Sequence, residues 1–506
     1  MRQGVLPFQY VGDSEAHGMT ALAGLGLYLD ALHASGLPAR ADRLVRLREA
    51  QGFRDGQMLV ALVLLNLAGG EGVSDIEALE QDAGLCALVR RAEQYGHGRR
   101  DRQAEERRWR TVRRRTFPSP SALFRYLASF HDEAQEAARA AGPLAFIPAP
   151  TAALRGLRGL NRDLVAWVQA VSPQPVATLD MDATLIETGK QEARYGYTGT
   201  KAYQPLQVYW AEQDLVVDSE FRDGNVPAGH EQLRVLTESL AALPAGVERV
   251  QLRSDTAGYQ QDLLLYCGEG KDPRFGTIPF AVGADMTEAL RAAARRTPTE
   301  EWHPLTEERA WGPHATGQEW AEVCFVPNWV GHTHRRGVYR YVAVREPVRQ
   351  AILPGLEGQL AFEALTMDDG AAYKVTAVVT NRDLPGDALL RWYRGRCGKS
   401  EEMHGVLKRD LAGGRMPSGS FGENAAWWAV AVLTATLHAA VKRLALGEGW
   451  RTKRLKAVRY GLINLAGRVV THGRALVIRV RAAHPGFEPL VTARRHLLAW
   501  ATGPPG

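Results

Sequence analysis

The pattern of apolar runs between residues 175 and 282 is the feature that most constrains the fold of this 506-residue chain. Residues 175–182 alternate apolar and polar side chains, and the runs at 205–210 and 215–221 flank a polar turn, as in a β-hairpin. Helical spacing follows at 230–243, then a strand-like run at 247–252, a helix at 262–267 and a strand at 278–282. Three strands, a helix, a strand, a helix and a strand, in that order, predict an α/β domain.

Composition excludes several classes of protein. Hydrophobic residues make up 45% and charged residues 23% of the chain, which is typical of a globular protein and excludes a wholly disordered or fibrous one. The four cysteines form no C-x-x-C pair, so we expect neither a disulfide framework nor a cysteine-rich zinc site, and we expect a reducing cytosol. The longest apolar stretch, residues 425–441, contains Thr434, Thr436 and His438, which predicts a buried helix and no membrane span.

Arginine is concentrated in one segment of a helical N-terminal region. Eleven arginines lie between Arg90 and Arg115, Trp109 lies among them, and only four acidic residues oppose them. A solvated helix face is one interpretation, but this density exceeds what such a face needs, so contact with nucleic-acid phosphates is favoured. The arginines taken as candidate DNA ligands are Arg107, Arg108, Arg113, Arg114 and Arg115.

Acidic residues stand out at three places. Asp180 and Asp182 share one face of the 175–182 strand, Asp255 follows the 247–252 strand, and Glu401 and Glu402 lie on a predicted helix. Taken singly, an exposed strand face or a loop acid explains each of them. Taken together, carboxylates from distant segments could hold two Mg²⁺ ions, which activate a nucleophile and stabilise the leaving oxygen of a phosphodiester.

Four short motifs carry a resemblance to a known family. They are Asp182-Ala-Thr184, Arg253-Ser-Asp-Thr-Ala-Gly258, Tyr393-x2-Arg396 and Glu401-x6-Lys408. On these motifs the chain resembles a DDE transposase of a bacterial insertion sequence, in the group with a Y-x2-R-x3-E-x6-K signature, and Asp180 matches the extra acid of the 1380-type branch.

The third motif departs from the family pattern. Four residues, rather than three, separate Arg396 from Glu401, so the strict spacing would place the acid at Ser400. Counting back from Lys408 favours Glu401, and Glu402 remains an alternative.

The resemblance implies a fold and an activity. It implies an RNase H-like catalytic core, a β-rich insertion and a DNA transposase that binds terminal inverted repeats as a homodimer, in the bacterial cytoplasm at the nucleoid. Asp182, Asp255 and Glu401 would hold two Mg²⁺ ions, with Mn²⁺ able to substitute. Asp180 would be an auxiliary ligand or an orienting acid. Tyr393, Arg396 and Lys408 would hold DNA phosphates. A nuclease or resolvase without strand transfer, and a domesticated DNA-binding protein without catalysis, are the alternatives.

The predicted division of the chain combines these features. The parts are a helical DNA-binding region, a first part of the core, a β-rich insertion, a second part of the core with the Glu401 helix, and a basic C-terminal region, at residues 1–150, 151–304, 305–373, 374–446 and 447–506. The insertion would bring a basic turn, residues 334–336, over the acids. His332 and His334 have a metal-like spacing without a supporting third ligand. Core packing is favoured over base stacking for the three tryptophans of this stretch, Trp311, Trp320 and Trp329.

Overall fold

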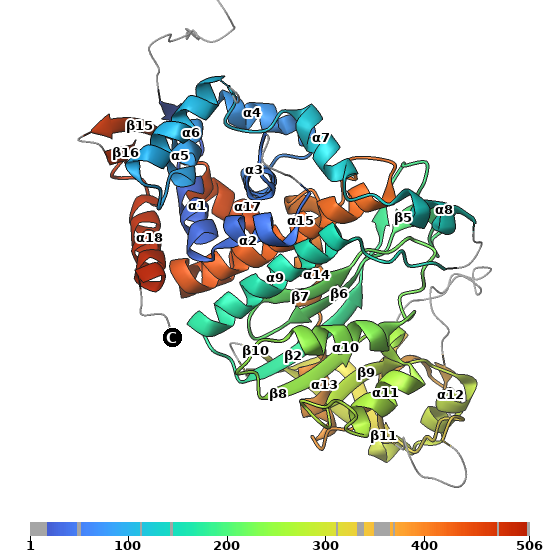
Figure 1. Ribbon diagram of the computed structural model, residues 1–506. Coiled ribbons are helices and arrows are strands. Elements are labelled where there is room, and N and C mark those ends of the chain that lie inside the picture. The colour runs from blue at the N-terminus through green and yellow to red at the C-terminus, as the bar shows by residue number, and fades with distance from the viewer. Residues whose placement is uncertain are drawn as a thin grey trace, which may run out of the picture.

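A ten-stranded sheet forms the centre of the computed structural model (Figure 1). The structure describes residues 18–47, 52–111, 114–141, 145–309, 312–330, 339–348, 365–367, 370–472 and 475–502. The sheet runs, from one edge to the other, through β10 (His303–Arg309), β11 (Gly312–Val323), β12 (Arg340–Pro347), β14 (Ala372–Thr380), β9 (Phe280–Ala284), β8 (Arg249–Ser254), β2 (Val176–Ala183), β6 (Leu206–Trp210) and β7 (Leu215–Glu220), and β13 (Leu365–Thr366) pairs with β14.

The middle of the sheet confirms the chain order predicted from the apolar runs. Strands β2, β6 and β7 come first, then α10 (Gln232–Ala242), β8, α11 (Gln261–Gly268) and β9. Strands β2, β8 and β9 are mutually parallel neighbours, whereas β6 and β7 form an antiparallel hairpin beside β2. The carboxyl ends of β2, β8 and β9 therefore meet at one edge of the sheet.

Both faces of the sheet are buried because the strands alternate their side chains. Leu179, Met181 and Val208 pack into a core that also holds the apolar residues of α10 and α11. Tyr209 and Val216 point the other way and pack into a core with α15 (Phe421–Ala440). Asp180 and Asp182 thus lie on the α15 side of the sheet, since they alternate with Leu179 and Met181.

The stretch expected to be a β-rich insertion contains strands that extend the same sheet. Strand β14 pairs antiparallel with β9, and β12, β11 and β10 follow outward from it. This arrangement covers the edge of β9, whose unpaired backbone groups would otherwise face solvent. Most of the piece expected at 359–365, and the basic turn at 334–336, lie outside the described residues.

The two ends of the chain form one helical layer. Helices α1 (Leu25–Ala34), α3 (Asp55–Ala68), α5 (Ala83–Glu93) and α7 (Pro120–Ala128) share an apolar core with α15 and with α18 (Phe487–Thr502). Strand β1 (Met19–Thr20) pairs with β15 (Gly467–His472), which pairs with β16 (Ala475–Val480), and Figure 1 shows these blue and red segments side by side. Residues 1–150 therefore bury part of their apolar surface against the C-terminal region. The proposed domain limits remain predictions.

The remaining elements connect these layers. They are α2 (Leu37–Leu44), α4 (Ile76–Gln81), α6 (Arg99–Thr111), α8 (Glu133–Ala141), α9 (Ala152–Val171), β3 (Ile186–Glu187), β4 (Arg194–Tyr195), β5 (Lys201–Tyr203), α12 (Glu288–Arg296), α13 (Gly386–Arg394), α14 (Lys399–Gly405), α16 (Glu448–Arg451), α17 (Leu455–Val458), the 3-10 turns η1 (Val73–Asp75), η2 (Thr256–Gly258) and η3 (Thr299–Glu301), and the π-helical turns η4 (Val406–Asp410), η5 (Val441–Leu446) and η6 (Arg459–Ile463).

The apolar stretch around α15 forms a buried helix, as predicted. Among the described residues, the helix Phe421–Leu446 is long and apolar enough to cross a membrane, and the bent pair Asp55–Ala68 and Val73–Gln81 passes the same test only if taken as one span. The protein itself buries 83% of the most apolar window of Phe421–Leu446.

Candidate active site

Two aspartates lie next to each other at the carboxyl ends of adjacent parallel strands. Met181 of β2 is in register with Ser254 of β8, so Asp182 and Asp255 occupy the next pair of positions. Neighbouring strands lie about 4.8 Å apart. Asp255 directly follows β8 and caps the turn η2, where its Oδ1 accepts a 3.0 Å hydrogen bond from the Ala257 amide. Strand pairing therefore brings together two acids that are distant in sequence.

The electrostatics of Asp182 reflect this crowding. Burial raises the pKa of Asp182, the charge of Arg396 opposes the rise and the charge of Asp255 adds to it, and together they bring this pKa to about 6. Arg396 Nη1 lies 3.2 Å from Asp182 Oδ2, and the two side chains are 12% and 18% exposed. The carboxylate pair thus has one adjacent guanidinium to balance its charge, and a further cation would be stabilised beside it.

Tyr393 and Arg396 approach the acids from the end of α13. A Cβ atom built on Gly283 would lie 3.0 Å from Tyr393 Oη and 3.2 Å from the Asp255 carbonyl carbon, so the hydroxyl lies close to the Asp255 backbone. The Arg396 guanidinium lies 5.8 Å from the Tyr393 ring centroid. Its Nε is buried and has no hydrogen-bond partner among the described residues.

Lys408 lies at the same edge of the sheet. It belongs to η4, the π-helical turn that continues α14, and its Nζ donates a 3.2 Å hydrogen bond to the carbonyl of Leu185, two residues after β2. The structure therefore brings Asp182, Asp255, Tyr393, Arg396 and Lys408 to one edge.

The two helix glutamates are placed differently. Glu401 is exposed in the first turn of α14, and in the described part of the chain its side chain makes no hydrogen bond or ion pair. Ser400, where the strict family spacing would put an acid, is only 3% exposed. Because a helix turns about 100° per residue, the extra residue after Arg396 rotates the acid from the buried side towards solvent.

Glu402 faces a small cavity on another side of α14. Asp214, Lys399 and Lys442 line this cavity with it. Over the described residues, no group of three or more His, Cys, Asp and Glu side chains is arranged to hold a metal ion. The third acid of the sequence prediction is thus not assembled with Asp182 and Asp255 in this arrangement.

Asp180 has its own partner. Arg253 Nε and Nη2 lie 2.6 and 2.8 Å from its two carboxylate oxygens, and the Asp180 side chain is fully buried. Burial raises the pKa of Asp180, and the hydrogen bonds from Arg253 oppose the rise. Of the two roles left open by the sequence, this arrangement favours an orienting acid over an auxiliary metal ligand.

Two nearby residues were missed by the sequence reasoning. Asp285 directly follows β9, the third parallel strand, and burial together with the charge of Asp255 raises its pKa. An acid directly after an apolar strand is the signal that identified Asp255, and it could have identified Asp285. Arg253 gave no such signal, because only the parallel pairing of β2 and β8 places it against Asp180.

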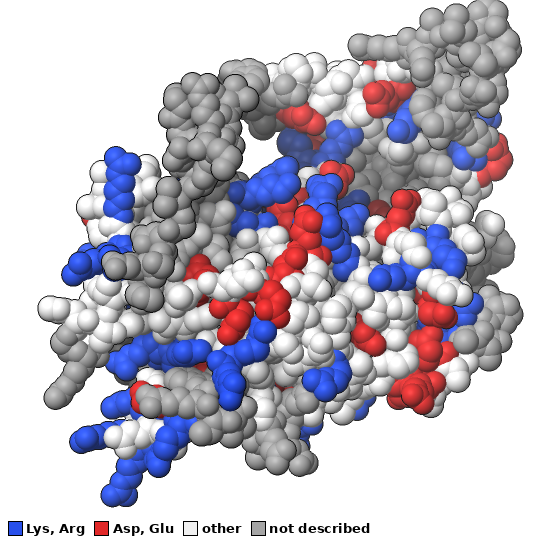
Figure 2. Space-filling model, turned by 90° about the horizontal axis from the view of Figure 1, so that it is seen from above, with Lys and Arg blue, Asp and Glu red and all other residues white. Residues whose placement is uncertain are grey.

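The candidate DNA-binding arginines of the N-terminal region differ in their exposure and in their partners. Arg115 donates to Glu77 at 2.9 Å and to the Phe117 carbonyl at 3.3 Å, so it anchors the chain after α6. Arg107 and Arg114 are exposed, and Arg107 Nε donates to the Gln103 carbonyl. The side chain of Arg108 and all of Arg113 lie outside the described residues. Figure 2 shows Lys and Arg in several groups with Asp and Glu between them, on the face seen from above.

The tryptophans of the 305–373 stretch pack within the protein where they are described. Trp320 packs against the core around Leu305 and Val342 and lies 5.0 Å from the His303 ring, and Trp329 lies 5.1 Å from the Tyr259 ring. This confirms the packing interpretation for both. Trp311, His332 and His334 lie outside the described residues.

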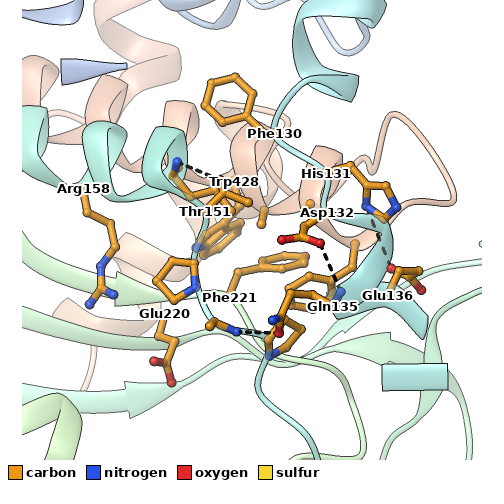
Figure 3. Close-up of a pocket in the computed structure, with 18 of the residues that line it drawn as sticks. Phe130, His131, Asp132, Gln135, Glu136, Thr151, Arg158, Glu220, Phe221 and Trp428 are labelled. Atoms are coloured by element: carbon orange, nitrogen blue, oxygen red, sulfur yellow. Dashed lines mark hydrogen bonds and ion pairs between the residues drawn. The ribbon is translucent and has the colours of Figure 1, made fainter. Parts of the chain in front are cut away.

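A separate cavity of about 70 Å³ lies where α8, α9, β7 and α15 meet (Figure 3). Figure 3 shows the rings of Phe221 and Trp428 at its centre, with Arg158 and Glu220 to one side and His131 and Glu136 to the other. None of the predicted site residues is among the described residues that line it.

Comparison with known protein families supports the resemblance to a DDE transposase. The family described as "Transposase DDE domain group 1" matches residues 13–499. No curated protein matches the chain. A solved structure, the cryo-EM structure of a piggyBac transposase synaptic complex with hairpin DNA, aligns with 85% of this chain and 79% of that chain, at a TM-score of 0.45 and 10% sequence identity. A likeness of that size establishes neither fold nor function, whereas the family match covers nearly the whole sequence. The chain belongs to the DDE transposase family, domain group 1.

Proposed function

We propose that this DNA transposase binds terminal inverted repeats, cleaves the ends of its element and joins the resulting 3′-OH to target DNA. The observation that carries the proposal is the placement of Asp182 and Asp255 at adjacent strand ends, with Arg396 ion-paired to Asp182. The strand order β7-β6-β2-β8-β9, with an antiparallel hairpin beside three parallel strands, supports an RNase H-like core. We also propose an origin in a bacterial insertion sequence, the 1380-type branch and a nucleoid location, on the sequence resemblance alone.

The donor set fits a divalent metal. Asp182 and Asp255 supply carboxylate oxygens, which hard cations such as Mg²⁺ and Mn²⁺ prefer. Burial raises the pKa of Asp182 and the charge of Asp255 adds to the rise, so a bound cation would stabilise the charged form of Asp182. Glu401, on the exposed side of α14, would supply the third carboxylate, with Glu402 as the alternative. When bound, two Mg²⁺ ions would supply Lewis-acid stabilisation of the attacking and leaving oxygens of a phosphodiester.

The cationic and hydroxyl groups at this edge would orient the DNA strand. Arg396 neutralises Asp182 and still has a buried Nε–H without an acceptor among the described residues, which suits a phosphate oxygen. Tyr393 can donate its hydroxyl hydrogen to a second oxygen, and Lys408 adds a positive charge near the end of β2. These groups would hold the scissile phosphate over the two aspartates.

The arginines around α6 would bind the DNA flank by contacts with phosphates rather than with base edges. A transposase that joins two ends would act as a homodimer on DNA.

A strand-transfer assay tests the proposal. A labelled duplex that ends in the inverted repeat flanking the gene, with a free 3′-OH, is incubated with the full-length protein, Mg²⁺ and a supercoiled plasmid. The proposal expects a labelled joined product that Asp182→Asn and Asp255→Asn both abolish. Nicked or cut DNA without joining would identify a nuclease or resolvase. Tight binding without any cleavage would identify a domesticated DNA-binding protein.

A further inference from the structure

The ion pair between Asp180 and Arg253 is enclosed in the sheet beneath the candidate active site. Its side chains are 0% and 6% exposed, and two parallel hydrogen bonds of 2.6 and 2.8 Å join the guanidinium to the carboxylate. The pairing uses one edge of the guanidinium and one hydrogen bond to each Asp180 oxygen. A planar fork of this kind fixes the orientation of the guanidinium as well as its position.

The remaining edge of Arg253 reaches the helix that carries the phosphate-binding residues. Arg253 Nη1 donates a 2.7 Å hydrogen bond to the carbonyl of Trp392, in the last turn of α13, and the same carbonyl accepts a 3.2 Å hydrogen bond from the Gly395 amide that caps the helix. The guanidinium also lies 5.3 Å from the centroid of the Trp392 ring. A Cβ atom built on Gly395 would lie 2.8 Å from Arg253 Nη1, so the chain leaves α13 in close contact with this group.

Tyr393, which directly follows Trp392, lies beside the Asp255 backbone, and Arg396, three residues further on, forms an ion pair with Asp182. The strand acids and the phosphate-binding residues are therefore joined by one chain of contacts, from Asp180 through Arg253 to the Trp392 carbonyl. We propose that the Asp180–Arg253 pair is a positioning device that holds the last turn of α13 so that Tyr393 and Arg396 meet the two aspartates, and that Asp180 is not a metal ligand. The role in cleavage rests on the proposed function, whereas the role in holding α13 does not.

Substitutions in the full-length protein separate this role from the alternatives. Asp180→Asn keeps the shape and removes the charge, and Arg253→Met keeps much of the length and removes the fork. Arg253→Lys keeps the charge but cannot donate to Asp180 and Trp392 in the same geometry. Because a small misplacement near the reacting groups is costly, we expect each variant to lower single-turnover cleavage of the labelled repeat duplex by about a hundredfold, with the Kd for that duplex changed less than about threefold. The double variant Asp180→Asn/Arg253→Met should lose no more than either single variant, because both act through one contact chain.

Binding of Mn²⁺, followed by electron paramagnetic resonance, distinguishes positioning from metal ligation. Mn²⁺ affinity should be unchanged in Asp180→Asn and much reduced in Asp182→Asn. Equal loss of Mn²⁺ affinity in the two variants would overturn the proposal.

A matched ion pair controls for a general loss of stability. Arg158 on α9 and Asp218 on β7 form a similar two-bond pair of 3.0 and 2.5 Å, away from the α13 turn. Arg158→Met and Asp218→Asn should lower thermal stability and leave the cleavage rate constant of the folded protein within about twofold of that of the wild type.

Amide hydrogen exchange provides a readout that does not depend on the proposed function. Exchange in peptides covering residues 390–398 should increase in Asp180→Asn and Arg253→Met and stay unchanged in the Arg158 and Asp218 variants. If the wild type cleaves no DNA but exchange follows this pattern, the proposed function fails and the positioning role stands. Unchanged exchange at 390–398 in both the Asp180 and Arg253 variants would overturn the positioning role itself.

Discussion

The acids on strands and the acids on the helix are determined in different ways. Asp182 and Asp255 are held next to each other by the hydrogen-bonded register of β2 and β8, which runs from the pair Val176 and Arg249 to the pair Met181 and Ser254. Glu401 and Glu402 depend on the rotational phase of α14, a short helix that begins after Gly398. If a strand shifts by one residue, all its side chains move to the opposite face of the sheet, so the register of a half-buried strand is strongly fixed. One extra residue before a helix instead rotates the direction of every following side chain by about 100° around the helix axis. A motif spacing is therefore a more reliable guide to the strand acids than to the helix acid.

The largest expected effect is the loss of the strand acids. Asp182→Asn and Asp255→Asn should each lower cleavage of the repeat duplex on the order of a thousandfold or more, because each is nearly isosteric and removes a charge at the reaction centre. End binding, measured by fluorescence anisotropy, should change less than about threefold, since phosphate contacts elsewhere dominate affinity. A variant that cleaves at the wild-type rate would remove that residue from the catalytic set.

The helix acids provide the sharpest test of the comparison. Glu401→Gln should lower single-turnover cleavage about a hundredfold or more, whereas Glu402→Gln, beside Lys442 and Asp214, should change it less than about threefold. The reverse result would show that α14 turns its other side to the DNA, and the assignment of Glu401 would be wrong. Equal, small effects would show that α14 supplies no acid to the reaction.

The titration of His404 tests which side of α14 is buried in solution, without DNA. Burial, together with the charges of Lys408 and Arg396, lowers its pKa to about 4. Because the folded-state pKa lies below the unfolded value, the unfolded chain binds the proton first as the pH falls. The contribution of neutral His404 to the free energy of unfolding is therefore fully present above about pH 6.5. It is lost as the pH falls from 6.5 to 4, to a total of up to about 3 kcal/mol.

Denaturant unfolding at pH 7.5 and pH 4.5 measures how much the free energy of unfolding falls over this range. His404→Gln should lose less stability over that range than the wild type does. If the two proteins lose the same stability, His404 is not buried as it is in this arrangement, and the placement of Glu401 on the same helix would need revision.

The smallest expected effect is a difference in the salt dependence of DNA binding between an exposed arginine, Arg114, and an anchored one, Arg115. Arg114→Ala should reduce the slope of log K against log salt for end binding by about 0.9, the value of one phosphate contact. Arg115→Ala should change the slope less, because Arg115 is bound to Glu77 and the Phe117 carbonyl. Replacing Arg107, Arg108 and Arg113 as well should lower the slope further. An unchanged slope would make the segment a solvated surface.

These binding measurements need the full chain. The described helices of residues 1–150 share a core with α15 and α18, so a fragment that ends at 150 would lack the helices that complete the core around α1 and α3. Such a fragment could lose DNA binding through unfolding alone, which would say nothing about the arginines.

Local sequence pattern determined the elements of the central sheet and the family. Alternation at 175–182 and the apolar runs that follow predict β2, β6, β7, β8 and β9 in order, because a buried strand or helix needs its characteristic period wherever it packs. The motifs around Asp182, Asp255, Tyr393 and Arg396 were sufficient to suggest the DDE transposase family, to which the chain belongs. The apolar composition of 425–441 was sufficient to predict a buried helix.

Only the tertiary structure decided which groups face one another. The pairing of β12 with β14, which joins the expected insertion to the core sheet, depends on backbone partners that carry no local signal. The union of the two chain ends in one helical core is likewise invisible in either end alone. In the sequence Arg253 is only the first residue of the second family motif, and the tertiary structure identifies its partners, Asp180 on the next strand and the Trp392 carbonyl. The physical reason is that periodicity reflects burial within an element, whereas ion pairs and strand neighbours arise between elements that are distant along the chain.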